Sequence, residues 1–577
     1  MTEQTASTAV LVLGAGVSGL AMARWCVRMG AQVTVADTRQ DTARLQQLQT
    51  ASPQLSFVQC AFDNTLMASN NWSAVYRSPG LSPAQLHEVR SWCDANGVNY
   101  GNEVDLFVQG LIDHEPQPEV PAAEPEQLSL DDQAVLAQVK TLNETVDEAV
   151  ADAPEVDGEE DTLVDDIEDD EAQVDELPIV PAAPVSLKPQ VLAVTGTNGK
   201  TTVCALTAQL LQRAGVDAIA AGNIAPSLLD ALSECLDAGR WPQVWVLELS
   251  SFQLDNCTSL QPNAATIVNI SQDHLDWHGD MASYVAAKAN VFGSLGLRVL
   301  NRGDAQVMQF EPAPPAAPKR GEAVAPHATW ASFGTDTPTR VGDWGLDTTN
   351  GLTWLVRAQP LDDTIQKPKR GQVAAPVEVY MQRLMPADAL RIRGQHNATN
   401  ALLALALATS TGADLAAMLH GLREYTGEAH RMQSVAVVND VEYFDDSKGT
   451  NVGATLAAIK GLGNERRLVV ILGGDGKGQD FEPLGAVVAQ FVRAVVLIGR
   501  DAPQIRQALA ATGVPLLDAT DMAQAVALSQ AQAQTGDAVL LSPACASFDM
   551  FDNYAHRARV FTQAVSNLAA DAGVELS

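Results

Sequence analysis

A glycine-rich stretch with one lysine and two adjacent threonines, Gly196-Thr-Asn-Gly-Lys-Thr-Thr202, has the composition of a phosphate-binding loop. The apolar residues Val191 to Val194 before it predict a buried strand, and the apolar run after it predicts the start of a helix. A strand, a glycine turn and a helix N-terminus direct backbone N–H groups and the helix dipole at an anion. Lys200 adds a positive charge and Thr201 a hydroxyl that can ligate Mg²⁺. Although the loop is shorter than the usual P-loop, it favours an ATP site over an ordinary strand–turn–helix corner.

A second glycine motif, Gly14-Ala-Gly-Val-Ser-Gly19, follows the apolar strand expected over 9–13. A helix ending near residue 30 and a strand over 32–36 come next, and Asp37-Thr38-Arg39 closes that strand. An acid about 20 residues beyond the glycines matches the dinucleotide-binding fingerprint, in which it binds a ribose. The same backbone geometry holds any nucleotide diphosphate, so the motif alone does not identify a nicotinamide dehydrogenase.

Length and composition limit the remaining possibilities. A chain of 577 residues is too long for one core, and we expect three or four domains. No leader and no apolar run of about 20 residues is seen, which predicts a cytoplasmic protein without a membrane span. The seven cysteines are scattered, as suits reduced thiols rather than a disulfide frame or zinc site. The net charge of −34 argues against nucleic acid as a partner.

The negative charge is concentrated in one segment. Residues 111–186 hold 24 Asp and Glu with one Lys, and residues 111–187 hold no aromatic side chain. Such a segment buries too little apolar surface to offset its ordering entropy, which predicts a disordered insertion, with a regulatory binding tail as the alternative. The expected organisation is therefore a Rossmann-like first domain (1–110), the acidic insertion (111–187), a central P-loop-type α/β domain (188–427) and a Rossmann-like C-terminal domain (428–577). Strands alternating with helices from Pro189 onward predict parallel sheets.

Two strands of the expected central domain end in side chains that can do chemistry. The strand from Trp245 ends in Glu248, with Ser250 close behind, and the strand over 264–270 runs into Asp273 and His274. Ligands of open parallel sheets collect at the carboxyl ends of the strands, so both ends can face the Lys200 loop and its metal. A solvated acid and a capping histidine are the plain alternatives.

These blocks together resemble the Mur ligases, ATP-dependent amide-forming enzymes of peptidoglycan synthesis. The resemblance rests on Gly196 to Thr202, Glu248-Leu-Ser-Ser-Phe-Gln253, Asp273-His274, Gly394-Gln-His-Asn397, His430-Arg431 and Asp446-Ser-Lys448, which occur in the family's order. It spans nearly the whole chain except 111–187 and two Pro-rich loops over 308–326 and 367–376. Asp37-Thr38-Arg39, Gly473-Gly-Asp-Gly-Lys477 and Ser542-Pro-Ala-Cys-Ala-Ser-Phe-Asp549 look most like the members that add D-glutamate to UDP-N-acetylmuramoyl-L-alanine.

The resemblance implies roles for individual residues. The UDP-substrate would be held by Val17, Ser18, Asp37, Thr38, Arg39, Ser78, Gly80 and Asn223. ATP would be held by Gly196, Thr197, Asn198, Gly199, Lys200, Thr201, Thr202, Asn397, Asn400, Arg431 and Asp446. D-Glutamate would be held by Lys448, Thr450, Lys477, Ser547 and Tyr554, although a phenylalanine is more usual at the last position.

The resemblance also implies the catalytic and metal-binding set. Lys200, Glu248, His274 and Lys288 would be catalytic, and Mg²⁺ would occupy two sites formed by Thr201, Ser250, Glu248, His274 and Lys288. Lys288 matches the family lysine that becomes carbamylated, a change that converts a cation into an anion of the kind a magnesium site needs. The family further implies a monomer.

Several alternatives remain open at this point. The Gly14 motif alone allows a nicotinamide-dependent oxidoreductase, but that hypothesis leaves the Lys200 loop without a function. A non-catalytic ATP-dependent scaffold would use the acidic insertion to recruit partners. The nearest alternative is a sister ligase that adds L-alanine, a diamino acid or a dipeptide, or a folate-type polyglutamate ligase.

Overall fold

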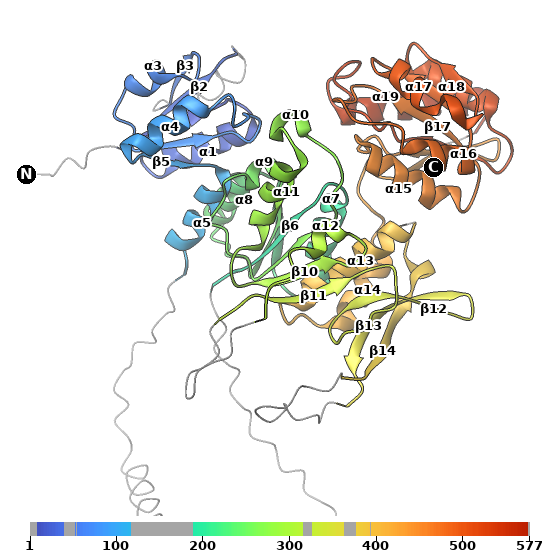
Figure 1. The fold of residues 1–577 in the computed structure, drawn as a ribbon, viewed down its shortest axis with the longest axis horizontal. Coiled ribbons are helices and arrows are strands. Elements are labelled where there is room, and N and C mark those ends of the chain that lie inside the picture. The colour runs from blue at the N-terminus through green and yellow to red at the C-terminus, as the bar shows by residue number, and fades with distance from the viewer. Residues whose placement is uncertain are drawn as a thin grey trace, which may run out of the picture. The chain divides into compact units, whose positions relative to one another are not determined.

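The computed structural model describes residues 8–39, 52, 55–116, 188–314, 326–362, 377–392 and 394–574, which form three α/β domains (Figure 1). The expectation of a three-domain α/β protein is confirmed. Residues 117–187, nearly all of the expected acidic insertion, lie outside the described residues. So do 315–325 and 363–376, which include most of the two expected Pro-rich loops.

The first domain is a parallel sheet of five strands in the order β3-β2-β1-β4-β5. Its strands are β1 (Ala9–Leu13), β2 (Gln32–Asp37), β3 (Leu55–Gln59), β4 (Ala74–Arg77) and β5 (Asn99–Gly101). Its helices are α1 (Val17–Arg28), α3 (Asn64–Ala68), α4 (His87–Asn96) and α5 (Glu103–Asp113). Helix α5 starts with a capping box formed by Asn102 and Asp105, and it includes the first three residues of the expected insertion, of which Leu111 packs against the apolar core.

The glycines of the first loop serve close backbone packing. Gly14 has φ +88°, a conformation that side chains with a Cβ rarely adopt. A Cβ at Gly19 would lie 1.9 Å from the carbonyl oxygen of Gly14, so α1 can start this close to the loop only with glycine there. Gly16, by contrast, has no atom within 4 Å of an added Cβ.

The central domain contains a nine-stranded sheet in the order β14-β13-β12-β11-β10-β9-β6-β8-β7. Its strands are β6 (Gln190–Thr195), β7 (Ala218–Gly222), β8 (Val244–Glu248), β9 (Ala264–Ile267), β10 (Leu297–Asn301), β11 (Thr329–Phe333), β12 (Trp344–Thr349), β13 (Leu352–Pro360) and β14 (Val379–Pro386). Across the sheet, all neighbouring strands from β7 to β12, β6 included, pair in parallel, as the alternating pattern predicts. Strands β12, β13 and β14 form an antiparallel edge that the sequence did not reveal.

Helices pack against this sheet, and the longest of them, α13, is almost wholly apolar on its buried side. They are α7 (Lys200–Arg213), α8 (Leu228–Asp237), α9 (Ser251–Leu254), α10 (Leu275–His278), α11 (Met281–Ala289), α12 (Ala305–Met308), α13 (Gln395–Thr409) and α14 (Leu415–Glu424), with short 3₁₀ turns at Asn290–Phe292 and Ala387–Ala389. Helix α13 buries every residue from Ala401 to Ala408, which fixes the position of its polar first turn.

The C-terminal domain has a six-stranded sheet in the order β15-β16-β20-β17-β18-β19, parallel except for β15 with β16. Its strands are β15 (Gln433–Val438), β16 (Val441–Asp445), β17 (Leu468–Gly473), β18 (Val492–Ile498), β19 (Leu516–Asp518) and β20 (Ala538–Leu541). Its helices are α15 (Val452–Gly463), α16 (Leu484–Phe491), α17 (Ala502–Leu509), α18 (Met522–Gln532) and α19 (Tyr554–Asp571), with a 3₁₀ turn at Ala510–Thr512. An apolar cluster lies on each face of this sheet.

The first and central domains share one apolar core. The ring of Phe107 on α5 packs edge-on against Trp245 on β8, with the ring centroids 5.1 Å apart. Buried Arg77 at the end of β4 donates to the Asp255 carboxylate and to the Asp255 carbonyl, both at 2.9 Å. The contact between these two domains therefore resembles the interior of a single domain.

Among the described residues, no helix is both long and apolar enough to cross a membrane. All seven cysteines are free thiols.

We predict that Gly19→Ala destabilises the first domain, because the new methyl would force α1 away from the carbonyl of Gly14. The expected loss in the free energy of unfolding is about 2–3 kcal/mol, as for other overpacked sites. Gly16→Ala is the matched control in the same loop and should cost less than about 1 kcal/mol. Urea unfolding followed by circular dichroism measures both, and equal losses would contradict the close-packing explanation.

Candidate functional site

The glycine loop follows β6, at the topological switch point of the central sheet, where β8 lies on one side of β6 and β9 on the other. The loop over 196–199 joins β6 directly to α7, whose first residue is Lys200. Gly199 has φ +83°, and a Cβ there would lie 2.9 Å from Oδ1 of Asn400. Crevices at such switch points hold ligands in open α/β sheets, which agrees with the predicted phosphate site.

Two lysine amines meet at this loop. Nζ of Lys200 donates to the carbonyls of Gly196 and Thr197, both at 2.8 Å. Nζ of Lys288, on α11, donates to the same Gly196 carbonyl at 2.8 Å. Burial lowers the pKa of Lys200, and the charge of Glu248 partly opposes this. Burial, assisted by the charge of Lys200, lowers the pKa of Lys288 well below its usual range, which favours the neutral amine.

Glu248 is buried at the end of β8 with one oxygen unused. Its Oε1 accepts a hydrogen bond from Nδ2 of Asn223 at 3.0 Å, while Oε2 has no hydrogen-bond partner among the described residues. An unpaired buried carboxylate oxygen is costly unless a cation or donor meets it. The hydroxyl of Ser250, the other predicted metal ligand at this strand end, caps the short helix α9 and donates to Gln253.

His274 begins α10 in a left-handed conformation, with φ +54°. Its Nε2 lies 3.6 Å from Oδ2 of Asp273, and its ring packs against Phe252. Burial lowers the pKa of His274 to about 4 despite the opposing charge of Asp273. The imidazole is therefore neutral near pH 7 and can offer a lone pair to a metal or to a donor.

The C-terminal domain supplies two cations to the same loop. Nη2 of Arg431 and Nζ of Lys448 both donate to the hydroxyl of Thr201, at 2.9 and 3.3 Å. Burial and the charge of Arg431 lower the pKa of Lys448 to about 8. Fully buried Arg557 on α19 donates to the carbonyls of Ser447 and Cys545, which fixes the loop that carries Lys448.

A cavity of about 310 Å³ adjoins the glycine loop. Its lining includes many of the residues predicted to hold ATP: Asn198, Gly199, Thr202, Asn397, Asn400, Arg431 and Asp446. Asp446 is buried, and burial raises its pKa to about 7 although Ser542 donates to it at 2.7 Å. His396 also lines this cavity, and the prediction did not include it.

A second cavity, of about 660 Å³, brings together residues predicted for three different ligands. Val17, Ser18 and Asn223 come from the UDP-substrate set, Thr201 and Arg431 from the ATP set, and Lys448 and Tyr554 from the amino-acid set. The aromatic ring of Tyr554 lies 5.3 Å from Nζ of Lys448.

The remaining predicted residues lie outside both cavity linings. Asp37 accepts from the N–H of Ala15 at 2.8 Å. Burial alone would raise the pKa of Asp37, but hydrogen bonds from Arg39 and from backbone N–H groups hold it below the usual value. Ser78 donates to the Gly14 carbonyl at 3.0 Å, so both side chains shape the first glycine loop. Thr38, Arg39 and Gly80 are exposed, Thr450 and Lys477 half-buried, and Ser547 buried.

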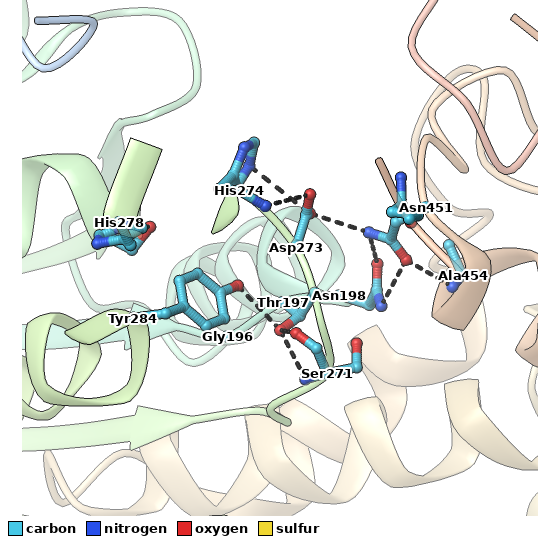
Figure 2. A network of polar contacts seen from close by, with 12 residues as sticks. Gly196, Thr197, Asn198, Ser271, Asp273, His274, His278, Tyr284, Asn451 and Ala454 are labelled. Carbon is cyan, nitrogen blue, oxygen red and sulfur yellow. Dashed lines mark hydrogen bonds and ion pairs between the residues drawn. The ribbon is translucent and has the colours of Figure 1, made fainter. Parts of the chain in front are cut away.

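Sequence reasoning gave no role to several side chains of this site. Asn451 and Asp273 join Asn198 in one polar network, and the hydroxyl of Tyr284 lies 3.0 Å from that of Thr197 (Figure 2). His278 lies 2.9 Å from Ser251 through its Nε2. The sequence did contain a signal for Asn451, because this residue directly follows Thr450 and stands three positions after Lys448, both of which were predicted to bind D-glutamate.

Three family models match this chain in sequence. The Mur ligase MurD-like N-terminal domain matches residues 8–96, the Mur ligase middle domain residues 194–317, and the Mur ligase glutamate ligase domain residues 430–545. The chain is 54% identical to a UDP-N-acetylmuramoylalanine–D-glutamate ligase of Polaromonas sp., over 98% of this chain and 99% of that protein. It belongs to the Mur ligase family.

Two further relatives bear the same name. The ligase of Albidiferax ferrireducens is 51% identical, over 98% of this chain and 97% of that protein. The ligase of Ralstonia nicotianae is 49% identical, over 99% of both chains. The family assignment made from the motifs is thus confirmed along the length of this Mur ligase.

We predict that pyrophosphate binds at the glycine loop and that Lys200→Ala weakens its binding about 10- to 100-fold. Loss of a hydrogen bond to a charged group typically costs about 1.5–3 kcal/mol, which corresponds to this range. Lys460→Ala, which removes an exposed lysine of α15, should bind as the wild type does. Isothermal titration calorimetry measures all three, and equal affinities would contradict the assignment of Lys200 to a phosphate.

Proposed function

We propose that this Mur ligase joins D-glutamate to UDP-N-acetylmuramoyl-L-alanine with consumption of ATP, a step of peptidoglycan precursor synthesis. The observation that carries the proposal is the 660 Å³ cavity, whose lining comes from the first glycine loop, the phosphate loop and the loop of Lys448. The names of the relatives, at 49–54% identity, support D-glutamate over the amino acids of the sister ligases. They also support a ligase over a nicotinamide-dependent oxidoreductase.

ATP is proposed to lie along the phosphate loop with its base in the 310 Å³ cavity. Asn397 and Asn400 on α13 would face adenine, while the glycine loop, Lys200 and Arg431 would hold the phosphates. Arg431 and Lys448 both donate to the Thr201 hydroxyl, so the phosphates of ATP would meet two cations there.

The side chains present fit a divalent cation beside the phosphates. The unpaired Oε2 of Glu248 and the hydroxyl of Thr201 are hard oxygen ligands of the kind Mg²⁺ prefers, and His274 offers a neutral nitrogen. Among the described residues, no three His, Cys, Asp or Glu side chains form a metal-binding cluster, so phosphates and water would complete the coordination. Bound Mg²⁺ would neutralise charge that gathers on the transferred phosphoryl group. A second Mg²⁺ near His274 and Lys288 is part of the proposal.

D-Glutamate is proposed to bind next to Lys448. Its two carboxylates need cations, which Lys448 and Lys477 would supply. Thr450, Ser547 and Tyr554 would complete this subsite. The UDP end would lie on the first domain at Val17, Ser18, Asp37, Thr38, Arg39, Ser78 and Gly80.

The chemistry has two steps. The alanyl carboxylate attacks the γ-phosphorus of ATP, the bond to the β-phosphate oxygen breaks, and an acyl phosphate and ADP form. The amine of D-glutamate then attacks the acyl carbon, loses a proton, and expels inorganic phosphate to leave the amide. The protein would contribute chiefly by holding the reacting groups of three substrates close together and by neutralising phosphate charge with Lys200, Arg431 and Lys448.

We predict phosphate release from ATP when UDP-N-acetylmuramoyl-L-alanine and D-glutamate are both supplied. L-Glutamate, L-alanine and a diamino acid should give less than about one-hundredth of that rate, because a site built for one arrangement of charges leaves other ligands unpaired. A coupled phosphate assay measures each combination. Release with one of the other amino acids would indicate a sister ligase, and no release with any of them would contradict the proposal.

We also propose that Lys288 is carbamylated. Its buried, readily neutral amine can attack CO₂, forming an N–C bond and losing a proton, and the product is an anion beside Lys200. The protein kept in ¹³C-bicarbonate should show a carbamate carbon signal by NMR that is absent in Lys288→Met and retained in Lys460→Ala. Identical spectra for the wild type and Lys288→Met would exclude this modification.

A further inference from the structure

The side chain of Asn451 connects two loops of the central domain to the C-terminal domain (Figure 2). Its Nδ2 donates to Oδ1 of Asn198 at 3.0 Å and to Oδ2 of Asp273 at 3.2 Å. Its Oδ1 accepts from Nδ2 of Asn198 at 3.2 Å and from the N–H of Ala454 at 2.8 Å. One buried carboxamide therefore uses both of its donor hydrogens and both acceptor positions.

Both partners of Asn451 in the central domain are themselves fixed. The N–H of Asn198 donates to Oδ1 of Asn269 at 2.9 Å, and Nδ2 of Asn269 returns a bond to the carbonyl of Asn198 at 3.1 Å. The other oxygen of Asp273 accepts from the N–H of His274 at 3.0 Å. Asn451 thus contacts the phosphate loop and the turn of His274 at the same time.

The backbone near Asn451 is shaped for this contact. Gly453, in the first turn of α15, has no side chain, and a Cβ there would lie 2.9 Å from Oγ of Ser271 and 3.2 Å from Nδ2 of Asn198. The start of α15 therefore approaches the central domain as closely as its backbone permits. On the other side of Asn451, the same loop carries Thr450 and Lys448.

We propose that Asn451 is a positioning residue that aligns the amino-acid subsite of the C-terminal domain with the phosphate loop and the turn of His274. The effect on catalysis that this inference predicts rests on the proposed function. Asn451 touches no reacting atom in this scheme. It sets the distance between the acyl phosphate and the amine by holding the two loops that bear them, and small displacements of this kind slow a reaction strongly.

The chemistry of the carboxamide separates this role from helix capping. Asn451 is also the N-cap of α15, and serine and aspartate cap helices about as well as asparagine. Asn451→Ser keeps a capping oxygen but is too short to reach Asn198 and Asp273. Asn451→Asp keeps both length and cap, but replaces the donor to Asp273 with a second negative charge.

In the coupled assay, we expect kcat to fall at least 10-fold in Asn451→Ser and further in Asn451→Asp, while KM for the UDP-substrate stays within twofold. Gly453→Ala should lower kcat similarly by pushing α15 away. Asp521→Ser, which exchanges the capping residue of α18, is the matched control and should behave as the wild type. A role limited to capping predicts normal kcat in Asn451→Ser, and kcat within twofold in both Asn451 variants would overturn the proposal.

Hydrogen–deuterium exchange on the full chain without substrates tests the same inference independently of the activity. Amides over 196–200 and 270–275 should exchange at least about fivefold faster in Asn451→Ser, and at the wild-type rate in Asp521→Ser. Unchanged exchange would overturn the positioning role. If the wild type itself forms no product with D-glutamate, the proposed function fails. The exchange rates then decide by themselves whether Asn451 holds the two loops.

Discussion

Mutual repulsion between basic groups at the phosphate loop is the constraint on which the rest of the site depends. Lys200 and Lys288 share the Gly196 carbonyl, and Arg431 and Lys448 share the Thr201 hydroxyl. Where these groups are charged, they repel one another, more strongly in a buried site than in water. Burial lowers the pKa of these lysines, and the neighbouring cations add to the effect, so the site would be stabilised most by a polyanion. A bound polyphosphate would therefore attract cations of both the central and the C-terminal domain.

Local patterns predicted those parts of the molecule whose cause is local. The strand–glycine–helix units at Gly14 and Gly196 were predictable because strand, turn and helix signals lie within about 20 residues. The antiparallel edge over 344–386 was missed, since its strands alternate weakly and contain polar residues on both faces.

The residues of the candidate site likewise divide into those that local patterns could place and those that depend on contacts between domains. Lys200, Glu248 and His274 follow strand ends, so sequence could place them at one edge of a sheet. The contact of Asn451 with Asn198 spans 253 positions and depends on how two domains meet, which no periodicity encodes. The first glycine motif shows that a clear sequence pattern need not identify the ligand. Its acid, Asp37, accepts from the N–H of Ala15 in its own loop, so the fingerprint reports a backbone shape and not a particular nucleotide.

The interactions between domains differ in kind, and this difference indicates which domain can move. Phe107 and Trp245 join the first and central domains in one apolar cluster, where separation would expose a large buried surface. The apolar clusters of the C-terminal domain contain only its own residues, and its described contacts with the phosphate loop are polar. Polar contacts exchange readily with water, so the C-terminal domain can separate from the loop to admit substrates and return at small cost. A carboxamide that must re-form three hydrogen bonds with the central domain on return favours one register over its neighbours, which suits Asn451 to alignment more than to affinity.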